Sequence, residues 1–487
     1  MRSTTLRFGS FLAVLALVLA ACGDQSGESQ AASGSQEPAS SDGGTAGEPV
    51  EIHWFCCLGT GDNAETQVPT EEQVVADFNA SHDDIELVLE VVDYDSAFDT
   101  MSTEIAGGNA PDIVGPVGVS GAEAFHGQWL DLTSLIESTG YDMSQFPEAS
   151  VDFYNLGGDE GQVGIPFAAY PSMLYYNRDL FDEAGLEYPP HEYGATYSLD
   201  GEDVEWNFDT LQEIAKRLTV DVNGNDATSP DFDPTQIEQY GYEPTFQDLR
   251  AIGSYFGAGS LVAEDNATAQ IPDPWREAWK WHYENVFTHH VTMTEALRDA
   301  PEFGNENPFN AGRAAMGLSH LWYSCCVWPV DEDGTPIDPV WDMAVVPAND
   351  GTYTSNFNAD TFRIWGDTEH PEEAFEVLTY LLGEASTDLL NIYGALPART
   401  ADQDAYFAAQ DEKWTQGVDW QVVLDGLDYP DKPSFEAWTP AYQETFAAIV
   451  SFGSTLRTDD SLDIDAAIDD FQAELQSIYD GADDSGG

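Results

Sequence analysis

Hydrophobic and polar positions alternate in two different rhythms along the first third of the chain. Continuous apolar runs at residues 51–57 and 85–92 predict buried strands of a parallel sheet, and PDIVGPVGV at 111–119 predicts a third strand and its loop. Between them, residues 71–80 and 95–106 place apolar side chains at helical spacing. This β-α-β-α-β order predicts an α/β domain.

The segment 164–186, GIPFAAYPSMLYYNRDLFDEAGL, breaks the pattern. Its aromatic-rich part, 165–176, predicts a strand that contains Pro166 and Pro171. Because proline cannot donate to a ladder, we expect a poor ladder member that crosses between two halves of the protein. Asn177 is expected to cap a short helix over 178–184 that ends at Gly185.

Helical spacing also follows further along the chain, separated by loops. Residues 188–203 are expected to form a loop, followed by a helix within 206–218 for which Asp209 is the N-cap or a first-turn acid. Further helical patterns lie at 246–258, 274–287 and 369–382. These elements extend the α/β organisation over most of the chain.

Length and charge bound the kinds of protein that the chain can be. With 487 residues and 42% hydrophobic side chains, it is too long for one ordinary core, and two domains are expected. The 89 acidic and 15 basic residues give a net charge of −74. Nucleic acid and anionic lipid surfaces are therefore not expected as partners, because both need basic patches. We interpret the acidity as an adaptation to a salt-rich, halophilic setting that screens self-repulsion.

The N-terminus has the pattern of a secretory signal. Two arginines precede an apolar run at 11–19, and the run ends in LAAC at 19–22. This ending looks like a bacterial lipobox in which Cys22 is lipidated, and an ordinary signal with a chance cysteine is the alternative. Acyl chains would hold the protein on the outer face of the membrane. Residues 23–49 lack aromatic and large aliphatic side chains and are expected to be a flexible tether, while 481–487 are expected to be a disordered tail.

The remaining cysteines form two adjacent pairs, Cys56-Cys57 and Cys325-Cys326. Outside the membrane thiols tend to oxidise, and four cysteines allow three connectivities. Two of these join the N-terminal and middle parts of the chain, and the third forms two vicinal rings; all three remain open. A zinc site of four thiolates is the alternative, although CC…CC is not CxxC…CxxC. The acidic stretch 221–233 resembles a calcium loop but lacks its glycine and glutamate, so we expect no metal or cofactor.

Several short motifs follow one another in a fixed order between residues 50 and 480. They are GNAPDI at 108–113, WLDL at 129–132, PSMLYYNRDLF at 171–181, FNAGRAAMGLSHLW at 309–322 and GALPAR at 394–399. In this order they resemble those of family 1 extracellular solute-binding proteins of ABC transporters, the relatives of maltose-binding protein. The resemblance implies a two-domain periplasmic-binding-protein fold of the α/β class, with hinge crossovers and a ligand cleft between the lobes.

The same resemblance implies the extent of each lobe. The N-terminal lobe would comprise 50–168 and 341–368, and the C-terminal lobe 169–340 and 369–480. Crossings between them are expected at 165–176, at 327–341 and near Trp365. Rotation about these crossings would close the lobes around a ligand.

Candidate ligand-binding residues come from the family's contact positions. Tyr170, Trp322 and Trp438 fall on or near its aromatic positions and would stack on a sugar ring, while Asp62, Asn358 and Asp360 are the polar partners. Val117, in the loop that follows the third strand, and Phe246 complete the candidate set. Since the chain has 13 Trp, 21 Tyr and 25 Phe, core packing is the alternative for each aromatic residue.

The features together predict a lipid-anchored, monomeric, substrate-binding component of an ABC importer. It would capture a mono- or oligosaccharide and deliver it to permease subunits. No GxSxG, HExxH or Walker motif occurs in the sequence, so an enzyme is not expected. Two alternatives remain: a binding protein for a cationic or other small solute, and a secreted carbohydrate-acting hydrolase.

Overall fold

The computed structural model describes residues 49–61, 67–157, 160–304, 307–327, 340–432 and 438–485. All of them lie in one unit, Gly47–Gly487. The predicted signal peptide with Cys22, all but the last residue of the predicted tether, and Asp62 therefore lie outside the described residues. No helix in the described part is long and apolar enough to cross a bilayer.

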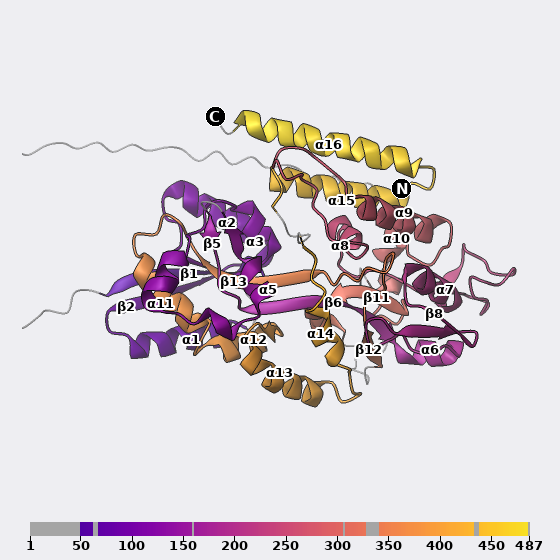
Figure 1. Ribbon diagram of the computed structural model, residues 1–487, viewed down its shortest axis with the longest axis horizontal. Helices are drawn as coiled ribbons and strands as arrows, with labels where there is room; N and C mark the ends of the chain where they lie inside the picture. Colours follow the sequence, from indigo (N-terminus) through magenta and orange to yellow (C-terminus); the bar gives the residue numbers. More distant parts are fainter. Residues whose placement is uncertain are drawn as a thin grey trace, which may run out of the picture. The chain divides into compact units, whose positions relative to one another are not determined.

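One mixed sheet of eight strands runs through this unit (Figure 1). Its strand order is β11-β6-β13-β3-β1-β2, and β12 and β14 also pair with β6. Strand β1 pairs in parallel with β2 and β3, which confirms the predicted β-α-β-α-β start. The strands are β1 Val50–Cys56, β2 Ile85–Val91, β3 Ile113–Val117, β6 Ala168–Asn177, β11 Met316–His320, β12 Trp341–Ala344, β13 Phe357–Ile364 and β14 Leu396–Pro397.

Strand β6 changes partners half-way along its length. Residues 168–171 pair with β13, whereas 172–177 pair with β11 and β12. The expectation that the prolines make this a poor ladder member is wrong, because β6 is the strand with the most partners. Pro166 lies before the strand, and Pro171 lies where one ladder ends, so its missing N–H is tolerated there. The next amide, that of Ser172, donates to the carbonyl of Asn356 at 3.0 Å.

Strand β13 makes a second crossing in the sheet. Its residues 357–360 pair with β6, and its residues 361–364 pair with β3, with an irregular register between Thr361 and Arg363. It ends beside Trp365, near which a crossing was expected. Of the other expected crossing, 327–341, residues 328–339 lie outside the described part.

Helices pack on the sheet and extend beyond it (Figure 1). Short hairpins are formed by β4 Asn155–Gly157 with β5 Gly161–Gln162, by β7 Thr196–Leu199 with β8 Glu202–Glu205, and by β9 Val220–Asp221 with β10 Ile237–Gln239. The helices are α1 Val68–Ser81, α2 Tyr94–Gly107, α3 Val119–Ala124, α4 Thr133–Thr139, α5 Glu148–Phe153, α6 Arg178–Ala184, α7 Phe208–Leu218, α8 Leu249–Ser254, α9 Asp273–Phe287, α10 Glu295–Arg298, α11 Pro371–Leu381, α12 Ser386–Tyr393, α13 Thr400–Lys413, α14 Gln421–Gly426, α15 Tyr442–Thr458 and α16 Ile464–Ser485. In the described part of the chain, the 3-10 helices are η1 Met143–Gln145, η2 Pro301–Phe303 and η3 Leu321–Cys326.

Capping residues explain where several helices begin and end. The side chain of Asn177 accepts hydrogen bonds from the amides of Asp179 and Leu180, and Gly185 ends α6 in the left-handed conformation, as predicted. Helix α7 is capped by Asn207, so Asp209 takes the second predicted role, that of a first-turn acid.

Three sequence-based element boundaries need correction. The expected loop 188–203 contains the first strand and the turn of the β7–β8 hairpin, which buries Tyr197 opposite Val204. The helix expected over 246–258 is the much shorter α8, because Asp248 caps it by accepting from the amide of Ala251. Helix α16 also continues to Ser485, past the start of the expected C-terminal tail.

Helix packing bears on the lobe boundaries, which stay a prediction. Helix α11 contacts β1 and β13, and α12 contacts α1. These contacts favour placing α11 and α12 with the N-terminal strands, although 369–480 was expected to belong wholly to the C-terminal lobe. Helices α15 and α16 pack on α9, as expected for the C-terminal lobe.

Candidate functional site

A cleft of about 750 Å3 lies beside the ladder in which β6 and β13 pair. Its lining comes from segments far apart in the sequence: the loop after β1, the start of α3, the two crossing strands, η3, and the ends of α12 and α13. The lining includes the side chains of Thr60, Tyr170, Trp322, Ser324, Asn358, Asp360, Tyr393 and Lys413. Four of these, Tyr170, Trp322, Asn358 and Asp360, belong to the set proposed from the sequence.

Strand register brings three of the predicted residues to one face of the sheet. Asn358 is the direct partner of Tyr170 in the antiparallel β13–β6 ladder. Asp360 lies two residues further along β13, so its side chain points to the same face as that of Asn358. The pairing of two crossing strands therefore builds the base of the cleft.

Thr60 links Asp360 and Tyr170 at this base. Its backbone amide donates to Oδ2 of Asp360 at 2.6 Å, and its hydroxyl also donates to that oxygen. The oxygen atoms of the Thr60 and Tyr170 hydroxyls are 2.8 Å apart. Burial raises the pKa of Asp360 and raises that of Tyr170 well above its usual value, while the hydrogen bonds from Thr60 act in the opposite direction.

Trp322 is half-buried at the cleft and held by a hydrogen bond. Its indole Nε1 donates to Oδ1 of Asn358 at 2.9 Å, and its ring stacks against the imidazole of His320, with centroids 5.8 Å apart. The ring of Phe246 lies 6.4 Å away on the same indole. The indole therefore has a fixed orientation, which a stacking platform requires.

Two glycines allow the loop after β1 to reach the base. A Cβ on Gly59 would lie 2.3 Å from the amide nitrogen of Gly118 and 2.9 Å from Oδ2 of Asp360. A Cβ on Gly118 would lie 2.9 Å from Oδ1 of the same carboxylate. Both backbones approach Asp360 more closely than a side chain would permit.

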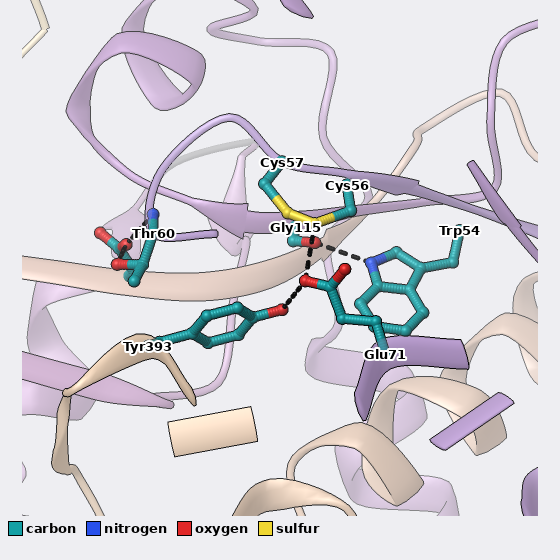
Figure 2. Close-up of a disulfide and its surroundings, with 8 residues drawn as sticks. Trp54, Cys56, Cys57, Thr60, Glu71, Gly115 and Tyr393 are labelled. Carbon is teal, nitrogen blue, oxygen red and sulfur yellow. Dashed lines mark hydrogen bonds between the residues drawn. A yellow bond between two sulfur atoms is a disulfide. The ribbon is translucent and has the colours of Figure 1, made fainter. Parts of the chain in front are cut away.

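A vicinal disulfide joins Cys56 and Cys57 at the end of β1 (Figure 2). Of the three predicted connectivities, only the one with two vicinal rings contains this bond, so the structure excludes a bond from Cys56 or Cys57 to the second pair. Beside the disulfide, the buried carboxylate of Glu71 accepts a hydrogen bond from Tyr393 at 2.7 Å, and its Oε1 lies 3.5 Å from Sγ of Cys56. The disulfide thus lies behind Tyr393, which lines the cleft.

The other predicted site residues lie elsewhere. Val117 is buried and does not line the cleft, although the next two residues do. Phe246 contacts Trp322 but lines a different pocket. Trp438 stacks on His126, with ring centroids 4.8 Å apart. Ligand contact by any of these residues stays a prediction.

Several cleft residues were missed by the sequence reasoning. Thr60 lies in the glycine-bearing sequence LGTG at 58–61, which is outside the family motifs. Ser324 follows the Trp322 motif by two residues, and Tyr393 directly precedes GALPAR, so both motifs could have indicated them. Lys413 ends α13 in a stretch without a motif, and no sequence signal points to it.

The acidic loop 221–233 is organised by its own backbone. The carboxylate of Asp221 accepts hydrogen bonds from the amides of Asn223, Asn225 and Asp233 at 2.8 to 3.0 Å. These bonds hold the pKa of Asp221 well below its usual value although desolvation opposes them. The stretch therefore has a structural role in closing the β9–β10 hairpin.

Comparison with known proteins gives one consistent result. Residues 63–388 match the family described as bacterial extracellular solute-binding protein. An uncharacterized lipoprotein from Streptomyces antibioticus is 25% identical over 450 residues, which are 90% of this chain and 87% of that protein. An arabinooligosaccharide-binding protein from Halalkalibacterium halodurans is 24% identical over 406 residues, 79% of this chain and 81% of that protein. The sugar-binding protein MalE from Xanthomonas citri has a similar fold, with a TM-score of 0.62, 14% identity, and coverage of 89% of this chain and 98% of that one.

Proposed function

The chain belongs to the bacterial extracellular solute-binding proteins, and on this premise we propose that it captures a mono- or oligosaccharide for an ABC importer. The observation that carries the proposal is the cleft, in which the fixed indole of Trp322 faces the same space as Tyr170 and Asp360. The family and the similar structures are non-enzymatic binding proteins, which confirms the prediction that the chain is not an enzyme and removes the hydrolase alternative.

The chemistry of the cleft suits a sugar. A pyranose has apolar C–H faces that stack on an aromatic ring and hydroxyl groups that need hydrogen-bond partners at the edge. Trp322 supplies the ring, and Asp360, Asn358 and Thr60 supply oxygen and nitrogen atoms. The volume of about 750 Å3 lies within the range of small-molecule sites and leaves room for more than one sugar ring. Two of the similar proteins are named for binding sugars.

Capture would proceed by closure of the two lobes. Strands β6 and β13 both cross between the halves of the sheet and both carry cleft residues. A rotation at these strands would change the distance between Trp322, after β11, and the loop after β1. A ligand that contacts both sides stabilises the closed arrangement in proportion to its preference for it.

Presentation to a permease would take place at the membrane surface. In this proposal Cys22 carries the acyl chains, the following residues up to 49 act as tether, and the binding unit works as a monomer on the outer face of the cell membrane. The name of the Streptomyces relative, a lipoprotein, supports the anchor.

A cationic solute is the second candidate. The carboxylates of Asp93 and Asp360 both line the cleft, and carboxylates attract ammonium groups. Lys413 lines the same cleft and would repel such a ligand. A neutral sugar is compatible with both charges, and for this reason it is the preferred ligand.

A thermal-shift screen in molar salt tests the proposal. We expect saturable stabilisation by a sugar, and loss of that stabilisation in Trp322→Ala, which should still be folded. Trp281→Ala is the matched control, because Trp281 is another half-buried tryptophan, is not a candidate ligand residue and does not line the cleft. Stabilisation by spermidine and by no sugar would select the cationic alternative. Equal sugar affinity in wild type and Trp322→Ala would show that the cleft assignment is wrong.

A further inference from the structure

A second hollow of about 270 Å3 is lined by residues of α8, α9, α10 and α15 and of the segment before α8. Figure 1 shows where these four helices lie. None of the residues that line this hollow lines the cleft, although its Phe246 contacts Trp322. The volume is several times the roughly 30 Å3 that one water molecule occupies in the liquid, so it can hold a small organic molecule.

His282 of α9 lines this pocket and is almost completely buried, with 1% of its surface exposed. Within the described part of the chain, neither of its ring nitrogens has a hydrogen-bond partner. Buried polar groups in folded proteins are nearly always hydrogen-bonded, and an exception indicates a partner that the protein itself does not supply. The imidazole therefore points to a bound molecule in the pocket.

Two arginines give the pocket a cationic side. Arg457 is buried, where its Nη1 pairs with Glu243 at 2.9 Å and donates to the carbonyl of Met293 at 3.0 Å. Arg298 lies on α10, with its Nη1 3.8 Å from Glu295. Burial and these two arginines lower the pKa of His282 well below its usual value, so its ring is neutral and donates through one nitrogen.

The pocket also contains two carboxylates, and one of them is fully used by the protein. Asp248 accepts from Nε and Nη2 of Arg250, each at 3.0 Å, and from the amide of Ala251 at 3.0 Å. Glu295 faces Arg298. The apolar part of the lining consists of Leu249, Ile252, Ile449 and Val450.

From this division we propose that the pocket binds a small organic carboxylate with a short apolar chain. The carboxylate would accept from the N–H of His282 and lie near the guanidinium groups of Arg298 and Arg457, and the chain would pack on Leu249, Ile252 and Ile449. Such a ligand accepts a hydrogen bond from the imidazole and contacts both the charged and the apolar residues of the lining. A hydrated inorganic anion would not contact the apolar residues. The site is independent of the proposed sugar site.

Butyrate is the test ligand, and 1-butanol is its uncharged counterpart of similar shape. We expect saturable binding of butyrate to the full chain by calorimetry and by saturation-transfer NMR, and at least about tenfold weaker binding of 1-butanol. Val450→Trp should block the pocket and abolish butyrate binding. Val222→Trp is the matched control, because both valines are 53% exposed and only Val450 lines the pocket.

Each result decides the proposal. Absence of saturable butyrate binding would show that the pocket holds water only, and binding that persists in Val450→Trp would place butyrate elsewhere; either overturns it. Equal binding of butyrate and 1-butanol overturns the requirement for a charge. His282→Phe is a second variant for the case that Val450→Trp fails to fold. It should also lose butyrate binding. Sugar binding should survive in both variants, so failure here is separate from failure of the cleft proposal.

Discussion

At the scale of single residues, Thr60 links two of the predicted ligand-binding residues through hydrogen bonds. Its amide and hydroxyl both donate to Asp360, and its hydroxyl also meets that of Tyr170. Because Asp360 is buried, its carboxylate needs these donors to remain in place. The residue thus fixes two of the predicted ligand contacts without having been predicted itself.

Thr60→Val should destabilise the protein by about 1–3 kcal/mol, since it leaves a buried carboxylate without a hydroxyl donor. Thr60→Ser keeps the hydroxyl and should change the free energy of unfolding by less than about 0.5 kcal/mol. Urea unfolding of the three proteins measures both values. A Val variant as stable as the Ser variant would contradict the role assigned to the hydroxyl.

The cleft residues that the sequence could predict are those at the contact positions of the family that the chain resembles. Trp322, Tyr170, Asn358 and Asp360 stand at fixed offsets in strands or just after them, and strand register then brings them together. Thr60 could not be predicted in this way, because its partner Asp360 is 300 residues away and the contact depends on how two loops approach.

At the scale of elements, the decisive contact is that of the loop after β1 with β13 and the start of α3. It depends on Gly59 and Gly118, which leave no space for a side chain beside Asp360. The vicinal disulfide precedes this loop, and Gly61 within it lies so close that a Cβ would come to 2.6 Å from Sγ of Cys57. The contacts of Gly59 with Gly118 and Asp360, and of Gly61 with Cys57, therefore fix the conformation of the loop up to Gly61.

Gly59→Ala should push the loop away from Gly118 and Asp360. Overpacking of this kind costs about 1–3 kcal/mol, and sugar affinity should fall as the Thr60–Asp360 hydrogen bonds are lost. Gly107→Ala is the control, because its Cβ would meet only the flexible side chain of Asn109, at 3.3 Å. Thermal unfolding and sugar titration of both variants test this, and equal behaviour would contradict it.

Periodicity predicted most elements correctly, and tertiary pairing explains the exceptions. The parallel β1–β2–β3 start followed from apolar runs alone. The expectation that Pro171 weakens the ladder assumed one continuous partner strand. Strand β6 instead changes from β13 to β11 beside that residue, where the missing N–H is tolerated. The short α8 differs from its predicted range because Asp248 offers a better cap than any preceding residue.

At the scale of the whole molecule, one of the few basic residues, Arg250, joins separate parts of the chain through buried ion pairs. Against a net charge of −74, Arg250 is almost completely buried and pairs with Glu123 of α3 at 2.9 Å and with Asp248 at 3.0 Å. Glu123 also accepts from Thr439 at 3.1 Å. This cluster joins α3, which follows the N-terminal strands, to α8 and to the segment before α15.

The protonation of Glu123 should make stability depend on pH. Burial raises the pKa of its carboxyl from 4.5 to about 7, against the attraction of Arg250. The folded state therefore holds a proton that the unfolded state has released, so the stabilisation from this group is present below pH 4.5 and is lost as the pH rises through about 7. A shift of this size corresponds to at most about 3 kcal/mol.

Glu123→Gln keeps the size and the hydrogen-bonding capacity of the side chain but cannot titrate. The free energy of unfolding of the wild type, relative to that of the variant, should fall between pH 4.5 and about 7 and then become constant. Comparing the two proteins at each pH cancels the titration of the other acidic residues, which the chain has in great number. The exposed Glu474→Gln is the control and should give a difference that does not change over this range. A constant difference for Glu123→Gln as well would mean that the buried carboxyl stays ionised and that the cluster joins α3 to α8 as a permanent ion pair.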